Sequence, residues 1–149
     1  MDDENYTCAA RRVSRGPAGI LVQENDVFGR IGEQGIARVV AAFYARVPQD
    51  DVLGPMYPPE DLEGAEQRLR DFLVYRFGGP QRYLEERGHP RLRARHGRFA
   101  IDARARDRWM TLMTGALAEA GIPADVERVM RTFLDGIATF LMNRGGEQA

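Results

Sequence analysis

The chain of 149 residues has one cysteine, two histidines and no lysine, so all 21 of its basic residues are arginine. The single cysteine, Cys8, excludes an intrachain disulfide framework. It also makes a thiolate zinc site implausible, because structural zinc sites need several Cys or His ligands. No apolar run approaches the roughly 18 to 20 residues that cross a bilayer. The formal net charge of -1 argues against broad binding of nucleic acid, which needs a net basic surface.

What remains is the balance of an ordinary soluble domain, with 44% hydrophobic and 29% charged residues. The length suits one domain that can bury a core or enclose a cofactor. The acidic start at Asp2–Glu4 does not resemble a secretory signal, so we expect a cytoplasmic protein. Residues 1–26 show no sustained periodicity and predict a flexible or loosely docked extension. The folded domain is expected over residues 27–144, with a tail over 145–149.

Four stretches place apolar residues at the spacing of three and four that is typical of amphipathic helices. They cover residues 33–47, about 59–77, 103–120 and 123–144. Asp102 is the predicted N-cap of the third helix, since its carboxylate can accept from the first free amides. Between residues 81 and 99, glycine and proline leave room only for short helical turns. No strand-like alternation competes, so the sequence predicts an all-α domain with a loose middle segment.

Both histidines lie in that middle segment, which reads FGGPQRYLEERGHPRLRARHGRF from Phe77 to Phe99. Imidazole is the commonest metal ligand among side chains, and neighbouring arginines suit a ligand that carries carboxylates or phosphates. Iron porphyrin with its two propionates would meet both demands at His96. The alternative is a surface histidine in a basic loop, and these residues alone favour it. His89, followed by Pro90 in a tight turn, is expected to be structural or to face a propionate.

Six motifs in register resemble the truncated haemoglobins, and more closely their second group. They are FYARV at 43–47, PMYP at 55–58, AEQRLRDFL at 65–73, FGGP at 77–80, RGHPRLRARH at 87–96 and RDRWM at 106–110. The match extends from about Phe28 to Asn143. The resemblance implies an all-α, globin-like fold, a two-over-two helical sandwich around one haem b.

The resemblance also implies roles for individual side chains. It makes His96 the proximal ligand of the haem iron. Tyr44, Tyr57 and Trp109 match the polar distal residues of this group, whose hydroxyl and indole groups can donate hydrogen bonds to a bound diatomic ligand. Ala65 takes a position where many globins carry histidine, so the polar work falls to these three aromatics. Periodicity alone would make each of them an ordinary core residue.

The other expected contacts to the cofactor are apolar walls and two arginines. The wall candidates are Leu69, Phe72, Leu73, Phe99, Met113 and Ile137. Arg68 and Arg95 are the candidates for the propionates, because arginine forms bidentate pairs with carboxylates. The alternative for the wall candidates is that they are ordinary core residues, and the alternative for the two arginines is that they belong to a solvent-exposed face.

The function implied by the resemblance is reversible binding of dioxygen and of related ligands such as nitric oxide and carbon monoxide, with oxygen transport among its roles. Nitric oxide dioxygenation would need an external reductase, because the chain has no Gly-rich dinucleotide fingerprint. A weak peroxidase activity has less support, since no distal histidine or acid–base pair is evident. The alternative from another class is a haem-free helical sensor or adaptor module. Either a monomer or a homodimer is compatible with the sequence.

Overall fold

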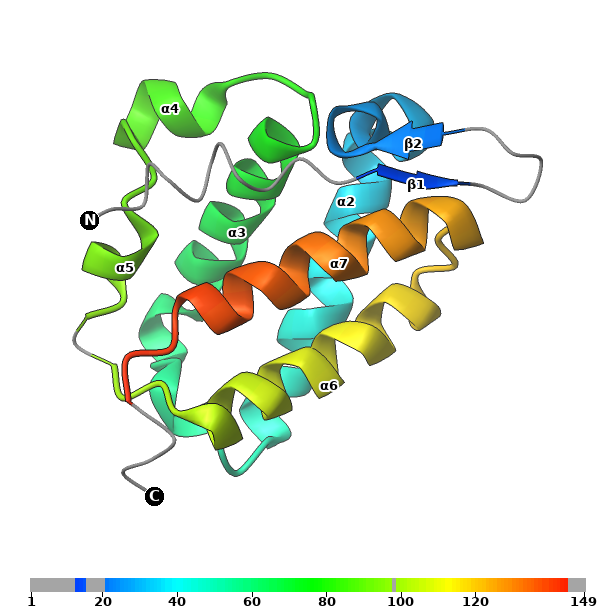
Figure 1. Cartoon of the computed structure of the whole chain (residues 1–149). Coiled ribbons are helices and arrows are strands. Elements are labelled where there is room, and N and C mark those ends of the chain that lie inside the picture. The colour runs from blue at the N-terminus through cyan, green and yellow to red at the C-terminus, as the bar shows by residue number, and fades with distance from the viewer. Residues whose placement is uncertain (1–12, 16–20, 98, 145–149) are drawn as a thin grey trace.

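The computed structural model describes residues 13–15, 21–97 and 99–144 (Figure 1). Its α-helices are α2 (Val27–Arg46), α3 (Leu62–Arg76), α4 (Arg82–Arg87), α5 (Leu92–Arg95), α6 (Ala103–Glu119) and α7 (Ala124–Phe140). Short 3-10 helices are η1 (Glu24–Asp26), η2 (Val47–Gln49), η3 (Gly54–Met56) and η4 (Pro59–Asp61). Two strands, β1 (Val13–Arg15) and β2 (Leu21–Gln23), pair antiparallel.

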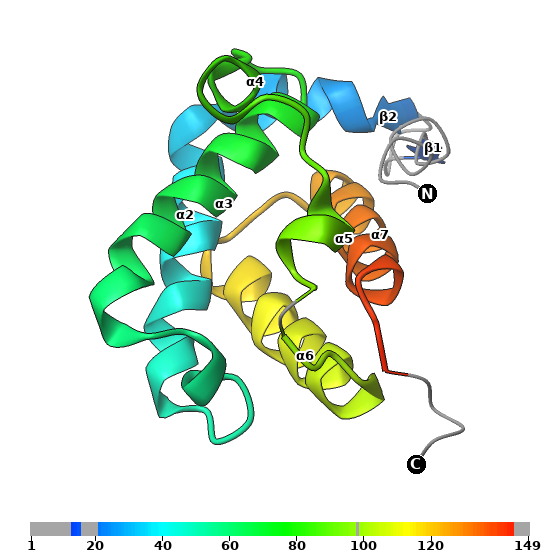
Figure 2. The same cartoon turned by 90° about the vertical axis from the view of Figure 1, so that its left-hand side faces the viewer.

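The four long helices form two layers. Helix α2 packs against α3 and α6, and α6 also packs against α7. Figure 2 shows α2 and α3 on one side, α6 and α7 on the other, and α5 in the foreground beside α7. The predicted all-α globin fold is therefore confirmed, with a small strand pair added at its N-terminal end. No helix within the described residues combines the length and the apolar character needed to cross a membrane.

Helix α2 begins six residues before the predicted start at Glu33, but it contains a kink at Gly32, where φ is 71° and ψ is 175°. Glycine adopts this conformation without the steric penalty that a Cβ would bring. Beyond the kink the predicted apolar face is buried, at Ile36, Val39, Val40 and Phe43. The hydrophobic pattern therefore located the regular part of the helix and missed the turn that precedes it.

Helix α6 begins as predicted, because the Asp102 carboxylate accepts from the amide of Ala105 at 2.9 Å. Helix α4 is fixed by an ion-pair cluster instead of a cap. Arg82, its first residue, contacts Glu33 of α2 at 2.7 Å and Asp71 of α3 at 3.3 Å. This cluster ties three helices together on one side of the molecule.

The segment before α2 is more structured than the flexible extension expected for residues 1–26. Within its described part, β1 and β2 lie against α7 (Figure 1). The Val22 side chain is buried in the core. Glu24 pairs with Arg76 of α3 at 3.2 Å. Strands of three residues are too short to produce a clear alternation in the sequence. The rest of that extension and the expected tail over 145–149 lie outside the described residues.

Candidate functional site

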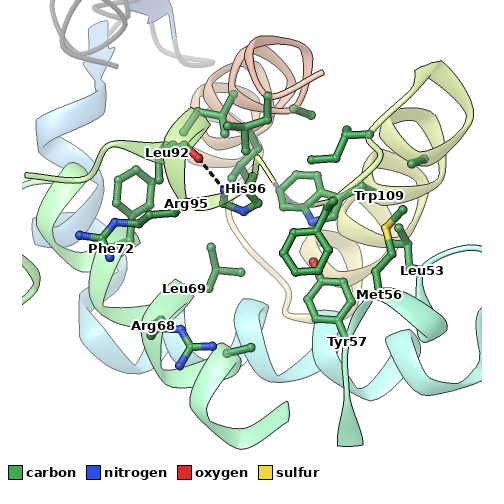
Figure 3. A pocket seen from close by; sticks show the side chains of 18 of the residues that line it. Leu53, Met56, Tyr57, Arg68, Leu69, Phe72, Leu92, Arg95, His96 and Trp109 are labelled. Carbon is green, nitrogen blue, oxygen red and sulfur yellow. Dashed lines mark hydrogen bonds between the residues drawn. The ribbon is translucent and has the colours of Figure 1, made fainter. Parts of the chain in front are cut away.

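A cavity of about 480 Å³ lies between the two helical layers, bordered by α3, α5, α6, the end of α7 and the connector that leads into α3 (Figure 3). Among the residues that line it are most of those predicted from the sequence: Tyr44, Tyr57, Ala65, Arg68, Leu69, Phe72, Leu73, Arg95, His96, Phe99, Trp109 and Ile137. An apolar cavity of this size with a few convergent polar groups is typical of a cofactor or small-molecule site.

The imidazole of His96 is oriented by its own helix. The ring atom Nδ1 lies 2.7 Å from the carbonyl oxygen of Leu92, one turn earlier (Figure 3). Because a carbonyl can only accept, Nδ1 must donate, and the neutral ring then carries its lone pair on Nε2. Histidines that bind metals usually donate their second N–H to a carbonyl or carboxylate in this way. The arrangement prepares Nε2 of His96 for a metal ion.

The turn before α5 is closed by Arg95. Its Nε donates to the carbonyl of Pro90 at 2.6 Å, and its Nη2 donates to those of Arg87 at 2.9 Å and His89 at 3.3 Å. Arg91, in the left-handed region with φ at 45°, makes this turn tight. Arg95 therefore stabilises the backbone of the segment that carries His96, independently of any ligand that the Arg95 side chain also binds. His89, expected to be structural or to face a propionate, is exposed and does not line the cavity.

Three aromatic residues that line the cavity lie close to one another: Tyr44 of α2, Tyr57 of the connector and Trp109 of α6. The ring centroids of Tyr44 and Tyr57 lie 5.6 Å apart, and the two ring planes meet at 81°. The ring centroid of Phe43 lies 5.1 Å from that of Tyr44 and 5.3 Å from that of Trp109. The Tyr44 hydroxyl donates to the carbonyl of Ala65 at 3.3 Å. Burial raises the pKa of Tyr44 far above its ordinary value, so the phenol stays protonated and remains a donor at neutral pH.

The Trp109 side chain acts on the hydroxyl group of Tyr57. Burial raises the pKa of the Tyr57 hydroxyl, and a hydrogen bond with the Trp109 side chain partly opposes that increase. Because the indole N–H can only donate, Trp109 is the donor and the Tyr57 oxygen the acceptor. The Tyr57 hydroxyl keeps its own proton for another acceptor. The sequence predicts three parallel donors, and all three residues line the cavity; the contact with Tyr57 adds an alternative in which Trp109 acts through Tyr57.

The connector that carries Tyr57 is attached to α6 through Asp50. Its carboxylate accepts from the amides two and three residues later, at 3.0 and 2.8 Å, and pairs with Arg108, the neighbour of Trp109. Burial raises the pKa of Asp50, but these hydrogen bonds outweigh it and hold the pKa below its ordinary value. The ion pair thus aligns the connector with the helix that carries the indole.

Two of the predicted contacts have different surroundings from those expected. Arg68 lines the cavity but is paired with Asp61, which also lines it, at 2.6 Å. Met113 does not line the cavity: it is fully buried in the hydrophobic core, one turn beyond Trp109 on α6. A spacing of four placed Met113 on the same helix face as Trp109, but at that depth α6 is already enclosed by its neighbours.

Other lining residues were not predicted as contacts, among them Leu53, Met56, Tyr83, Leu92, Ile101 and Leu134. Leu92 had a usable signal, because it precedes His96 by four residues and so lies on the same helical face. Leu53 and Met56 lie in the connector, where no periodicity could identify them.

Residues 26–143 match the family model described as bacterial-like globin. The chain is a bacterial-like globin. This globin is 33% identical over 120 residues to the group 2 truncated hemoglobin YjbI of Bacillus subtilis, covering 80% of this chain and 90% of that protein. The crystal structure of the Chloroflexus aurantiacus hemoglobin is similar, with 44% identity and a TM-score of 0.76 over 79% of this chain and 98% of that one. The group II truncated hemoglobin of Bacillus anthracis has 33% identity and a TM-score of 0.77 over 83% and 95% of the two chains.

These relatives confirm the predicted resemblance to the second group of truncated haemoglobins. Haem is the cofactor of this family, usually as haem b. The cavity of the globin fits such a group, since it offers one oriented imidazole, apolar walls and arginines beside them. Within the described part of the chain, no cluster of three or more His, Cys, Asp or Glu side chains could hold a bare metal ion instead.

Proposed function

We propose that this globin holds haem b through Nε2 of His96 and reversibly binds dioxygen or a related diatomic ligand. The observation that carries the proposal is the hydrogen bond from Nδ1 of His96 to the Leu92 carbonyl at the wall of a cavity of cofactor size. When bound, the haem supplies an iron centre that takes a diatomic ligand. The residues of the chain determine how firmly the cofactor is held and how long the ligand stays.

The proximal part of this proposal rests on His96. Donation from Nδ1 to a carbonyl fixes the tautomer and the ring orientation and raises the basicity of Nε2. Apolar side chains such as Leu69, Phe72 and Ile137 line the same cavity and exclude water from it. A dry surrounding strengthens every polar contact made inside it.

The distal part of the proposal rests on Tyr44, Tyr57 and Trp109. Tyr44 and Tyr57 have raised pKa values, so both phenols keep their proton at neutral pH. Tyr44 donates its proton to the Ala65 carbonyl, so donation to a ligand requires that this bond be exchanged. A neutral hydrogen bond to the ligand would stabilise it by about 1 kcal/mol. Trp109 acts on the ligand through Tyr57, whose hydroxyl it orients.

For the propionates we propose Arg68 first and Arg95 second. Arg68 lines the cavity, and its partner Asp61 has a half-exposed side chain, so a propionate can share or replace that carboxylate. Arg95 already spends Nε and Nη2 on three backbone carbonyls, which reduces what it can offer a ligand.

The finer expectations from the sequence stay predictions. They include binding of nitric oxide and carbon monoxide, nitric oxide dioxygenation with an external reductase, weak peroxidase activity, oxygen transport and a cytoplasmic location. The monomer and the homodimer also remain alternatives. The haem-free sensor or adaptor is the competing function, and the absorption spectrum of the purified protein separates it from ours.

The test of the proposal is replacement of His96 by glycine, with His89→Gly as the matched control. The wild-type protein reconstituted with haem should show a Soret band and one axial imidazole. His96→Gly should lose that ligation and regain it when free imidazole is added, because the small residue leaves room for it. His89→Gly should behave as wild type. A wild-type protein that takes up no haem, or a His96→Gly variant with unchanged ligation, would refute the proposal.

A further inference from the structure

Asn143 connects the end of α7 to the segment that carries His96, although the two residues are 47 positions apart. Its Oδ1 accepts from the amide of Ile101 at 2.9 Å. Its Nδ2 donates to the carbonyl of Phe99 at 2.9 Å and lies 3.4 Å from that of His96. Its backbone amide donates to the Ile101 carbonyl at 2.9 Å, so side chain and main chain bind the same loop.

The loop needs such an anchor because its own secondary structure is slight. Helix α5 has only four residues, and His96 is its C-cap, beyond the last helical residue. A helix of one turn is not stable on its own in water. His96 is followed at once by Gly97, and glycine loses more conformational freedom than any other residue when its backbone is fixed. The position of the imidazole therefore depends on contacts from other elements.

An asparagine side chain suits this task, since it offers one carbonyl acceptor and two N–H donors on a short stem. Here the acceptor and the donors serve backbone groups on both sides of one loop. Asn143 itself does not line the cavity, and in the sequence it marks only the end of the match to the family.

We propose that Asn143 is a positioning residue for the proximal imidazole, acting through the backbone of His96 and Phe99. The inference rests on the proposed function, in which His96 ligates the haem iron. Loss of Asn143 lets the His96–Ile101 loop move away from the end of α7, so the cofactor is held less firmly.

A second anchor makes the proposal testable without loss of the fold. Arg93 of α5 donates to the carbonyls of Phe140 and Met142, and so ties the same two elements together through different atoms. Substitution of Asn143 therefore leaves α5 attached to α7 and changes chiefly the loop that follows His96.

The experiment uses two variants of the full haem-loaded chain. Asn143→Ala removes both halves of the side-chain bridge, whereas Asn143→Asp keeps the acceptor for the Ile101 amide and loses the donor. Asn25→Ala is the matched control, because Asn25 is exposed in η1 and does not line the cavity. The readouts are the rate of haem transfer to an excess of an apoglobin, the iron–histidine vibration of the ferrous protein, and amide hydrogen exchange in the apoprotein.

Both Asn143 variants should lose haem about tenfold faster than wild type, which corresponds to one or two neutral hydrogen bonds. The iron–histidine band should shift or broaden in both. The amides of Gly97 and Phe99 should exchange faster in both variants, and that of Ile101 in Asn143→Ala, while those of α2 and α6 stay protected. Asn25→Ala should match wild type in all three measurements.

Several outcomes would overturn the inference. Haem loss and vibrational bands at wild-type values in both variants would show that Asn143 does not position His96. Wild-type behaviour of Asn143→Asp alone would show that only the Ile101 bond matters and that the donor does nothing for the proximal loop. A wild-type protein without any iron–histidine band would instead refute the proposed function, and the inference with it. If Asn143→Ala does not load haem, hydrogen exchange in the apoprotein decides between local loosening and general unfolding.

Discussion

The pairing of Trp109 with Tyr57 makes a quantitative prediction about dioxygen release. If Trp109 acts only by donating to the Tyr57 hydroxyl, its removal affects the ligand through Tyr57 alone. The two single variants are Trp109→Phe and Tyr57→Phe, and the double variant completes a double-mutant cycle that measures the coupling between the two residues. Because two residues in one hydrogen-bond network are coupled, their effects should not add.

The magnitude follows from the strength of one neutral hydrogen bond, about 1 kcal/mol, which corresponds to roughly a fivefold change in rate. Tyr57→Phe should therefore speed dioxygen dissociation about fivefold. Trp109→Phe should have an equal or smaller effect, since the Tyr57 hydroxyl remains and only loses its orienting partner. The double variant should match Tyr57→Phe alone. Independent donors would instead multiply to about 25-fold.

The assay is displacement of bound dioxygen by excess carbon monoxide in a stopped-flow spectrometer. Tyr75→Phe is the matched control, because Tyr75 lies in α3 outside the lining of the cavity and should leave the rate unchanged. A double variant that releases dioxygen about 25-fold faster than wild type would refute the relay and restore the three parallel donors predicted from the sequence.

Two further predictions concern stability. Burial raises the pKa values of Asp50 and Glu33, but hydrogen bonds, including those from Arg108 to Asp50 and from Arg82 to Glu33, hold both below the ordinary values of 3.8 and 4.5. Such carboxylates stabilise the fold above their unfolded pKa and lose that effect as the pH falls through the folded pKa. The Tm, followed by circular dichroism, should therefore stay level down to about pH 5 and fall below it. If the Tm of Asp50→Asn falls as steeply as that of the wild type, Asp50 does not have this role. Gly78→Ala should lower the free energy of unfolding by about 1 to 3 kcal/mol in urea titrations, because φ is +101° and the new Cβ would lie 2.3 Å from the Asn25 carbonyl oxygen. Gly88→Ala, with φ at +76° but open space, should cost less, and equal losses would refute the steric argument.

The sequence was sufficient to predict the elements that depend on local patterns. Four helices follow from hydrophobic spacing, and the start of α6 follows from the carboxylate of Asp102 at its N-cap. The sequence around His96 also predicts its local structure, because glycines and prolines allow only short helical turns there and the arginines make the segment basic. The assignment of His96 as the iron ligand needed the six motifs. For an isolated histidine in a basic loop, the residue pattern does not distinguish a metal ligand from an ordinary surface histidine.

The parts that escaped prediction depend on contacts between distant segments. The sequence predicts Arg95 as a propionate contact, but it cannot reveal that three backbone carbonyls in the same turn accept from this side chain. The sequence predicts Trp109 as a direct donor, and its contact with Tyr57, which suggests a relay instead, could not be foreseen from the residue pattern. Asn143 has no periodicity or motif that ties it to His96. Hydrogen bonds from a side chain to a remote backbone leave no trace in the order of residue types.

The two sides of the cavity are held by separate parts of the fold, and this separation has a functional consequence. The proximal loop depends on the end of α7 through Asn143, whereas the Tyr57 connector depends on α6 through the Asp50–Arg108 pair. Substitutions in the first set should therefore change the retention of haem, and those in the second the release of the diatomic ligand. Because no hydrogen bond within the described residues joins these two anchors directly, either property can change in evolution while the other is kept.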